Sequence, residues 1–275
     1  MITLNHVVRK NENVSSEAFR EYWLGEHAEK VMALSSKLGI KKYTKCEALI
    51  DDDVTGLLSN LYRTDDDCFD FVDQMLINDL ADFKKGMADP EVAEAFKALF
   101  QESLAYINPL RSNFWFTVAV PQLLSRESMV ATFENTYLKG IYIAKHRDEI
   151  TLTAAQLHWN ACHGGMASQY SEMLPYERYI QQHQMPSKVV NDLKSYLGVD
   201  FPNSDAFIGQ AEVWLDRKVI PTLQGPETEK MLRLLADDID LFVKPEERSI
   251  FATKEHILFS NSLINEVLPT LFNVD

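Results

Sequence analysis

Apolar and polar residues in the first part of the chain follow two different periods. A run rich in β-branched residues at 2–10 is typical of a strand, and the apolar residues after it recur at helical spacing as far as Gly39. Ser15 or Ser16 is the expected N-cap of this helix. A second strand is expected at 41–49. The pattern therefore predicts a β-α-β arrangement.

The pattern then predicts a strand, a helix and a strand. The apolar run LLSNLYRTD predicts a third strand at 57–65, and the residues after it predict a long helix that reaches Tyr106. The aromatic run at 113–120 predicts a fourth strand. The first half of the chain thus has the expected order β-α-β-β-α-β.

The second half of the chain repeats this order. Its strands are expected at 138–146, 177–184, 207–216 and 253–260. Thr151 or Thr153 is the expected N-cap of its first helix, which ends before Pro175, and its second helix is expected at 227–242.

A constant spacing links the two halves. Three pairs of uncommon residues lie 136 positions apart: Trp23 and Trp159, His27 and His163, and Tyr43 and Tyr179. Internal repeats of this kind indicate duplicated structural units. Matching Tyr62 to Trp214 gives a spacing of 152, which predicts about sixteen extra residues in the second half, within 186–205.

Each half has the element order of a ferredoxin-like unit. The apolar face of such a sheet that helices leave uncovered needs a partner. We therefore expect an α+β protein in which two ferredoxin-like units, at 1–125 and 126–275, pack as an intrachain pseudo-dimeric α/β barrel.

The charge and composition narrow the range of partners. The chain has 27 basic and 41 acidic residues and a formal net charge of −14. Nucleic-acid binding depends on neutralising phosphates, so this charge argues against nucleic acid and against anionic membranes. The three cysteines, Cys46, Cys68 and Cys162, form no CxxC motif, and neither a signal peptide nor a run of 18 apolar residues is evident. We expect a cytoplasmic protein, and a homodimer is compatible with this composition.

Several segments resemble a known family. YWLGEHA in the first half and HWNACHG in the second are similar to a helix motif of EthD-like domains, which belong to the dimeric α/β-barrel superfamily. In the second half, YERYIQQH, DAFIGQAEVWLD and KEHILF are similar to strands of that family. The resemblance covers most of both halves and implies a tandem of two such domains.

The resemblance implies an enzyme class only loosely. Domains of this kind include cofactor-independent isomerases, polyketide cyclases, dehydratases or decarboxylases, and quinol-type monooxygenases, while more distant barrels bind haem. EthD itself is associated with an oxidative ether-degradation system. Because one fold supports many reactions, function has to be argued from the site.

The two halves differ in chemistry. Five of the seven histidines lie in the second half: His146, His158, His163, His183 and His256. At the positions that match His183 and Glu212, the first half has Glu47 and Asn60. This asymmetry predicts one chemically equipped half and one more structural half.

Strand alternation assigns these side chains to faces. Ala211 and Val213 share one face of their strand, so Glu212 and Trp214 are expected to face the barrel interior. We expect a second-half barrel cavity lined by Tyr179, His183, Glu212, Trp214 and His256. A buried carboxylate near imidazoles suits acid–base chemistry. The alternative is a polar network that closes the interface between the halves.

His163 is a further candidate. It lies one helical turn from Trp159, so both share a helix face, and the glycines at 164–165 let a ligand approach the backbone. Because Trp23 and His27 have the same spacing in the first half, the alternative is that His163 only packs the helix onto the sheet.

The sequence therefore predicts a cofactor-independent enzyme, without metal, that acts on a small hydrophobic or cyclic molecule. His163 or His183 would move a proton, and Glu212 would orient a group or pair with a charge. The substrate would contact Trp159, Tyr179, Trp214 and His256. Isomerase, lyase and monooxygenase chemistry stay open. The alternatives are a non-catalytic barrel that binds a ligand or partner chain, and a haem-binding barrel with a histidine axial ligand.

Overall fold

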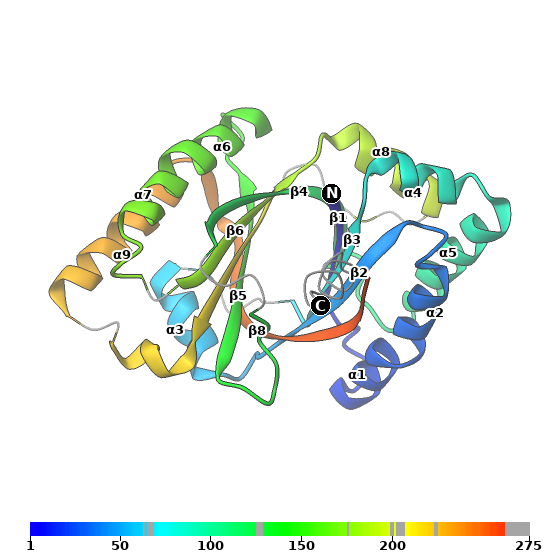
Figure 1. The fold of residues 1–275 in the computed structure, drawn as a ribbon, viewed down its shortest axis with the longest axis horizontal. Helices are drawn as coiled ribbons and strands as arrows, with labels where there is room; N and C mark the ends of the chain where they lie inside the picture. The colour runs from blue at the N-terminus through cyan, green and yellow to red at the C-terminus, as the bar shows by residue number, and fades with distance from the viewer. Residues whose placement is uncertain are drawn as a thin grey trace, which may run out of the picture.

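A computed structural model describes residues 1–62, 64, 69–124, 129–174, 176–198, 201, 207–222 and 225–261. Eight strands form a closed antiparallel barrel (Figure 1): β1 (Ile2–Val8), β2 (Ile40–Ala48), β3 (Phe71–Ile77), β4 (Asn113–Leu124), β5 (Tyr137–His146), β6 (Tyr176–Gln184), β7 (Phe207–Asp216) and β8 (Val243–Ser260). Their order around the barrel is β1-β3-β2-β8-β5-β7-β6-β4, and β4 pairs with β1 to close it. Closure pairs every strand on both sides, which removes exposed sheet edges.

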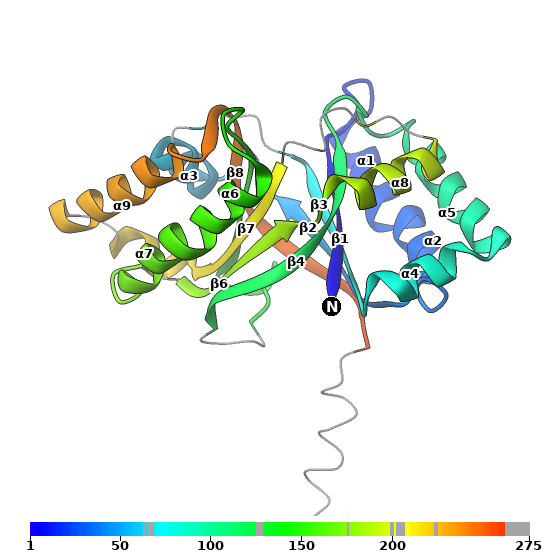
Figure 2. The same cartoon turned by 90° about the horizontal axis from the view of Figure 1, so that it is seen from above.

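Helices cover the outside of the barrel in two groups (Figures 1 and 2). The first group contains α1 (Ser16–Leu24), α2 (Glu26–Leu34), α4 (Leu80–Met87), α5 (Pro90–Ser103) and α8 (Ser187–Leu197). The second group contains α3 (Asp53–Tyr62), α6 (Leu152–His158), α7 (Gly164–Gln169) and α9 (Pro226–Ile239). None of the described helices is long and apolar enough to cross a membrane.

The helix starts follow from local chemistry. Ser15 accepts a hydrogen bond from the amide of Ala18, and Thr151 accepts one from the amide of Ala154, so each caps the first helix of its half. A π-helical turn at Trp159–His163 joins α6 to α7. Such turns add one residue to the helical repeat and occur frequently at functional sites.

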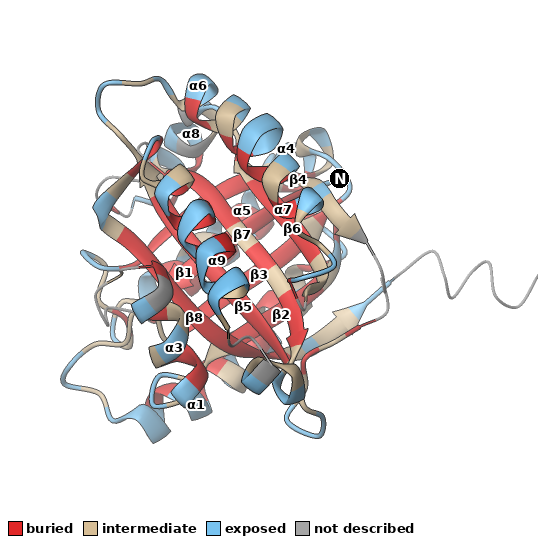
Figure 3. Cartoon of the chain, turned by 90° about the vertical axis from the view of Figure 1, so that its left-hand side faces the viewer, coloured by how far each residue is buried: buried red, intermediate tan, exposed pale blue. Residues whose placement is uncertain are grey.

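The strands are buried on both faces (Figure 3). Apolar side chains fill one end of the barrel interior: Val7, Cys46, Val72, Trp115, Ile141, Ile143, Phe207 and Phe251. Further apolar clusters lie outside the barrel, between the sheet and each helix group. The sheet therefore separates an inner core from two outer ones.

The predicted α+β class and barrel are confirmed, but the third strand of the first half was misplaced. Residues 57–62 belong to α3, and the third strand is β3 at 71–77. In α3 the buried side chains of Thr55, Ser59 and Tyr62 recur at helical spacing, whereas Leu57 is exposed. The strand β3, FVDQMLI, is buried on both faces, so its apolar residues fall on both faces and do not show the alternation that marks a half-buried strand.

The predicted insertion of about sixteen residues in the second half is also wrong. The connections β2–β3 and β6–β7 span residues 49–70 and 185–206, which is 22 residues in each case. Each connection contains a helix, α3 in the first and α8 in the second. The two halves therefore have connections of equal length, and matching Tyr62 to Trp214 paired a helix residue with a strand residue.

The two connection helices cross to the opposite half of the barrel. In Figure 1, α3 lies with α6, α7 and α9, while α8 lies with α4 and α5. The contacts agree, because α3 packs on β8 and α9, and α8 packs on α5 and β4. Residues from the first half of the chain therefore reach the helix layer of the second.

Candidate functional site

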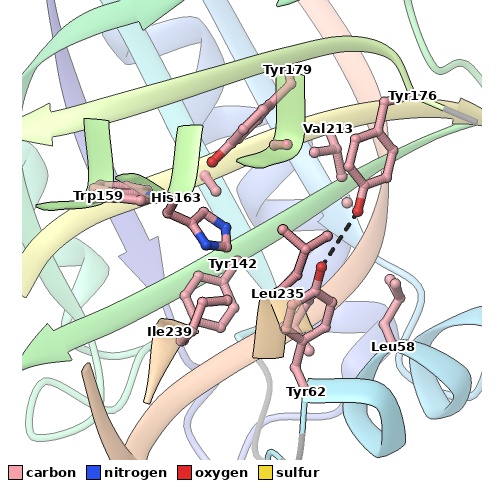
Figure 4. Close-up of a pocket in the computed structure, with 14 residues that line it drawn as sticks. Leu58, Tyr62, Tyr142, Trp159, His163, Tyr176, Tyr179, Val213, Leu235 and Ile239 are labelled. Carbon is pink, nitrogen blue, oxygen red and sulfur yellow. Dashed lines mark hydrogen bonds between the residues drawn. The ribbon is translucent and has the colours of Figure 1, made fainter. Parts of the chain in front are cut away.

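An apolar pocket lies outside the barrel, between the second-half strands and the helices that cover them (Figure 4). The space open to water-sized spheres is about 40 Å³, room for about three waters at 10–15 Å³ each. Tyr179, Ala211 and Val213 form its sheet wall. Helix residues such as His163 and Leu235 form the opposite wall, and Tyr62 from α3 closes one side.

His163 is the basic side chain among the described residues of this pocket. Its Nδ1 lies 3.0 Å from Asp238 Oδ2, and the other carboxylate oxygen lies 2.9 Å from His158 Nε2. Burial opposes ionisation of Asp238, but the two histidine contacts hold the pKa of this carboxyl below its ordinary value. A carboxylate accepts, so Nδ1 of His163 carries the proton that it donates to Asp238, and in the uncharged form of the ring Nε2 has the lone pair of an acceptor.

A hydrogen-bonded chain runs from His183 to the pocket. Nε2 of His183 lies 2.9 Å from Oε1 of Gln181, whose Nε2 donates to the Tyr179 hydroxyl at 2.9 Å and to the Trp159 carbonyl at 3.0 Å. The His183 ring stacks on Trp159 with a centroid distance of 4.9 Å. Burial lowers the pKa of His183 to about 4, so at neutral pH this ring is an uncharged donor.

Four tyrosines give the pocket its remaining polar atoms. The hydroxyls of Tyr62 and Tyr176 lie 3.4 Å apart, and Tyr142 and Tyr179 lie nearer His163 (Figure 4). Burial raises the pKa of all four phenols above the ordinary value, so they remain un-ionised. The pocket therefore combines an apolar wall, neutral hydroxyls and one imidazole held by a carboxylate.

A second polar group, centred on Glu212, lies inside the barrel. Lys139 Nζ lies 3.3 Å from Glu212 and 3.5 Å from Glu255, and the Trp214 indole donates to Glu255 at 2.9 Å. Burial alone would raise the pKa of Glu212, but Lys139 and the amides of two glutamines hold it below its ordinary value. The placement of Glu212 and Trp214 in the interior thus agrees with the alternation of their strand.

The predicted shared cavity is wrong, because the sheet divides its five residues. Tyr179 and His183 face the helices, whereas Glu212 and Trp214 face the interior. His256 lies at neither place, since its Nε2 contacts Glu47 at 2.7 Å in an ion-pair group with Arg20. The alternation of each strand was correct, but the faces of β6 and β7 were assigned to one side without their packing partners.

The predicted match between Asn60 and Glu212 is wrong as well. Asn60 lies on the exposed side of α3. In the sheet, Gln74 pairs with Asn5 as Glu212 pairs with Ile141, and the amide of Gln74 donates to Glu212 itself. The first-half counterpart of Glu212 is therefore Gln74, and the two meet inside the barrel.

Sequence reasoning missed Asp238 and Tyr62. A proline starts each of the helices α5 and α9, and Pro90 and Pro226 keep the spacing of 136. Applying the same spacing to the residues of α9 identifies the face of this helix that packs on the sheet. It does not identify the partner of Asp238, because a single aspartate forms no recognisable motif. No sequence signal indicates that Tyr62 reaches a pocket of the other half.

The corresponding place in the first half is filled. Asp73 accepts from Trp23, Tyr43 and Lys45, and Lys45 Nζ also lies 3.1 Å from His27 Nδ1. Burial lowers the pKa of Lys45 to about 8, although Asp73 opposes this shift. Aromatic rings, among them Phe100, Phe114 and Phe201, pack around His6 beside this cluster.

Within the part of the chain that the structure describes, no group of three or more His, Cys, Asp or Glu residues could hold a metal ion. Cys46 and Cys162 are free, and Cys68 lies outside the described residues. Burial raises the pKa of the Cys46 thiol to about 12, which makes it unreactive.

The family model described as the EthD domain matches residues 11–99. The resemblance seen in YWLGEHA is therefore confirmed for this segment, while a second EthD-like unit after it stays a prediction. No curated protein matches the chain.

Solved structures similar to this chain include two proteins described provisionally as monooxygenases and one described provisionally as a chlorite dismutase. The first, from Lactobacillus acidophilus NCFM, has 11% identity and a TM-score of 0.42, covering 94% of this chain and 99% of its own. The second, from Fusobacterium nucleatum subsp. nucleatum ATCC 25586, has 6% identity and a TM-score of 0.49, with coverages of 94% and 92%. The third has 8% identity and a TM-score of 0.41, with coverages of 97% and 98%. These likenesses add nothing to the assignment of an activity.

Proposed function

We propose that the chain is a tandem of two EthD-like ferredoxin-like units. Around the barrel, the strands of the first half lie in the order β4-β1-β3-β2, and those of the second follow in the order β8-β5-β7-β6. Since β5 to β8 are the first to fourth strands of their half, both orders are fourth-first-third-second in the same sense. Tyr43 and Tyr179 lie on the second strand of their halves, which supports duplication.

We further propose that the second half is a cofactor-independent enzyme that moves a proton on a small, mainly apolar molecule. The observation that carries this proposal is the His163–Asp238 pair on the wall of an apolar pocket. Nε2 of His163 is the base, because Asp238 fixes the proton on Nδ1 and stabilises the imidazolium that forms. An imidazole titrates near pH ~6.5 in water, which suits proton transfer at neutral pH.

The other predicted residues have different roles in this proposal. Tyr179 and Trp159 contact the substrate, and His183 positions Tyr179 through Gln181. Glu212 and Trp214 hold the barrel interior together, so they act on the site only through the sheet. With about 40 Å³ open to water-sized spheres, the pocket does not fit a porphyrin, and no step involves haem.

The test is hydrogen–deuterium exchange in a panel of small ring compounds that have an acidic C–H, both ketones and hydrocarbons. Proton NMR in D₂O follows the exchange rate with wild-type protein, with His163→Gln and with Asp238→Asn. We expect His163→Gln to remove about 10²–10⁴-fold of the enhancement, the usual contribution of one general base. Binding without exchange above the buffer rate would instead establish a non-catalytic ligand-binding barrel.

A further inference from the structure

The matching tyrosines of the two halves, Tyr43 and Tyr179, form different hydrogen bonds. Tyr43 donates its hydroxyl proton to Asp73 Oδ2 at 2.7 Å. Tyr179 has the matching place on β6, and its hydroxyl oxygen accepts from Gln181. The Tyr179 proton has no acceptor among the residues that the structure describes.

The sheet register explains this difference. Asp73 lies opposite Lys45 in the pairing of β2 with β3, and Ala211 lies opposite Gln181 in the pairing of β6 with β7. Ala211 therefore stands where the first half has its carboxylate, and it lines the pocket. The methyl group of Ala211 accepts no hydrogen bond. The hydroxyl proton that Tyr43 donates to Asp73 therefore has its counterpart in a Tyr179 proton that is available to a ligand.

The second half lacks both members of the ion pair that the first half has at this place. In the first half, the Asp73 carboxylate lies 2.8 Å from the Lys45 ammonium, and both side chains are fully buried. In the second half, Ala211 and Gln181 are both neutral. None of the described residues that line the pocket is Lys, Arg, Asp or Glu. A ligand that enters as an anion would find no Lys or Arg counter-charge among the described residues there, which is strongly unfavourable for a buried charge, whereas an enolate formed in the pocket is paired with the His163 imidazolium.

We propose that the pocket takes a small uncharged carbonyl compound whose oxygen occupies the place of the missing Asp73 carboxylate and accepts from Tyr179. This inference rests on the proposed function of His163. In Figure 4 the Tyr179 hydroxyl points toward the His163 ring, so one molecule spans both groups. The pocket volume limits this molecule to about the size of a five-membered ring.

The placement defines the reaction step. Nε2 of His163 takes a proton from the carbon next to the carbonyl. The electron pair of the broken C–H bond forms a C=C bond, and the C=O π pair moves to oxygen. The Tyr179 hydroxyl donates to the enolate oxygen, where the charge develops. The imidazolium then returns the proton to the same or another carbon, so the step needs no oxidant or reductant.

The experiment compares three probes of similar shape: cyclopentanone, methylenecyclopentane, which lacks the oxygen, and cyclopentanecarboxylate, which is charged. Ligand-observed NMR titration gives Kd for wild-type protein, for Tyr179→Phe and for Ala211→Asp. Tyr62→Phe is the matched control. It also removes a hydroxyl from this pocket, but the Tyr62 hydroxyl already contacts the Tyr176 hydroxyl.

We expect wild-type protein to bind the ketone about 10-fold more tightly than the alkene, as one net hydrogen bond allows. Tyr179→Phe should abolish this ratio and Tyr62→Phe should keep it. Ala211→Asp restores the first-half acceptor and should block both neutral probes. Equal binding of ketone and alkene, a ratio that survives in Tyr179→Phe, or tighter binding of the carboxylate would overturn the inference. Ketone selectivity without deuterium exchange would overturn the proposed enzyme while leaving the ligand class standing.

Discussion

The two halves of the barrel place Trp, His and Tyr at the same spacing and use them differently. In the first half, Trp23 and Tyr43 bind a carboxylate of the protein itself. In the second half, the matching residues Trp159 and Tyr179 line an open pocket. The matching Trp and Tyr residues have the same positions in the fold of each half. The chemical difference between the halves therefore depends on the residues around them.

Side-chain size accounts for the open space. In the register, Leu4 and Phe114 of the first half correspond to Gly140 and Ile250 of the second, and both of these smaller residues line the pocket. The partner of Ile250, Tyr142, is larger than its counterpart His6. Close packing leaves few voids in an ordinary core, so the smaller residues leave the space that the proposed function assigns to a ligand.

The largest difference between the halves should appear in proton exchange. His163→Gln should lower the exchange rate of a bound ketone about 10²–10⁴-fold, because it removes the base. His27→Gln is the matched change in the first half, and it should leave the rate within about 3-fold once folding is verified, since His27 is buried against Lys45. Equal losses in both variants would show that the chemistry is not confined to one half.

Stability should show the opposite asymmetry. Asp73→Ala leaves the fully buried Lys45 without its partner, which typically costs about 3–5 kcal/mol in the free energy of unfolding. Asp238→Ala removes contacts to one buried and one partly exposed histidine and leaves no buried ammonium unpaired, so it should cost about 1–2 kcal/mol. Urea denaturation at pH 7 measures both. A cost for Asp238→Ala that matches the cost for Asp73→Ala would mean that the second half also depends on a buried charge pair.

Acid should destabilise the protein through His6. Burial lowers its pKa from 6.5 to about 4, so between these pH values the unfolded chain binds the proton and the folded chain does not. The free energy of unfolding therefore falls as the pH decreases from 6.5 to 4, by up to about 3 kcal/mol.

His183 titrates over the same window, because burial lowers its pKa to about 4 as well. It is only half-buried, so its contribution should be nearer 1 kcal/mol after solvent screening. Urea denaturation at pH 7 and pH 5 separates the two. His6→Phe should flatten the pH dependence more than His183→Phe does, and the reverse order would contradict these assignments.

The smallest effects should be equal in the two halves. Ser15→Ala and Thr151→Ala each remove the side-chain cap of a first helix, at a typical cost of about 1 kcal/mol. Thermal unfolding of both variants measures this cost. A cap that matters in one half and not in the other would show that the barrel does not unfold as one unit.

The amino-acid sequence by itself determined the features that depend on neighbours along the chain. The strands β1, β2, β5, β6 and β7 follow from local patterns and lie within one or two residues of their expected bounds. The sequence also limited each first-helix N-cap to two residues, and Ser15 and Thr151 are the ones that cap. The spacing of 136 also matched Trp23 with Trp159, and both residues lie in the first helical segment after the first strand of their half.

Only the tertiary structure decided which residues meet. The strand β3 is buried on both faces, so its sequence lacks the alternation that marks a strand, and α3 was mistaken for it. Alternation showed that Glu212 and Val213 face opposite ways, but packing determined that the pocket lies on the side of Val213. The partnership of His163 with Asp238 joins residues 75 positions apart, and such contacts depend on how helices dock on a sheet, which no local pattern records.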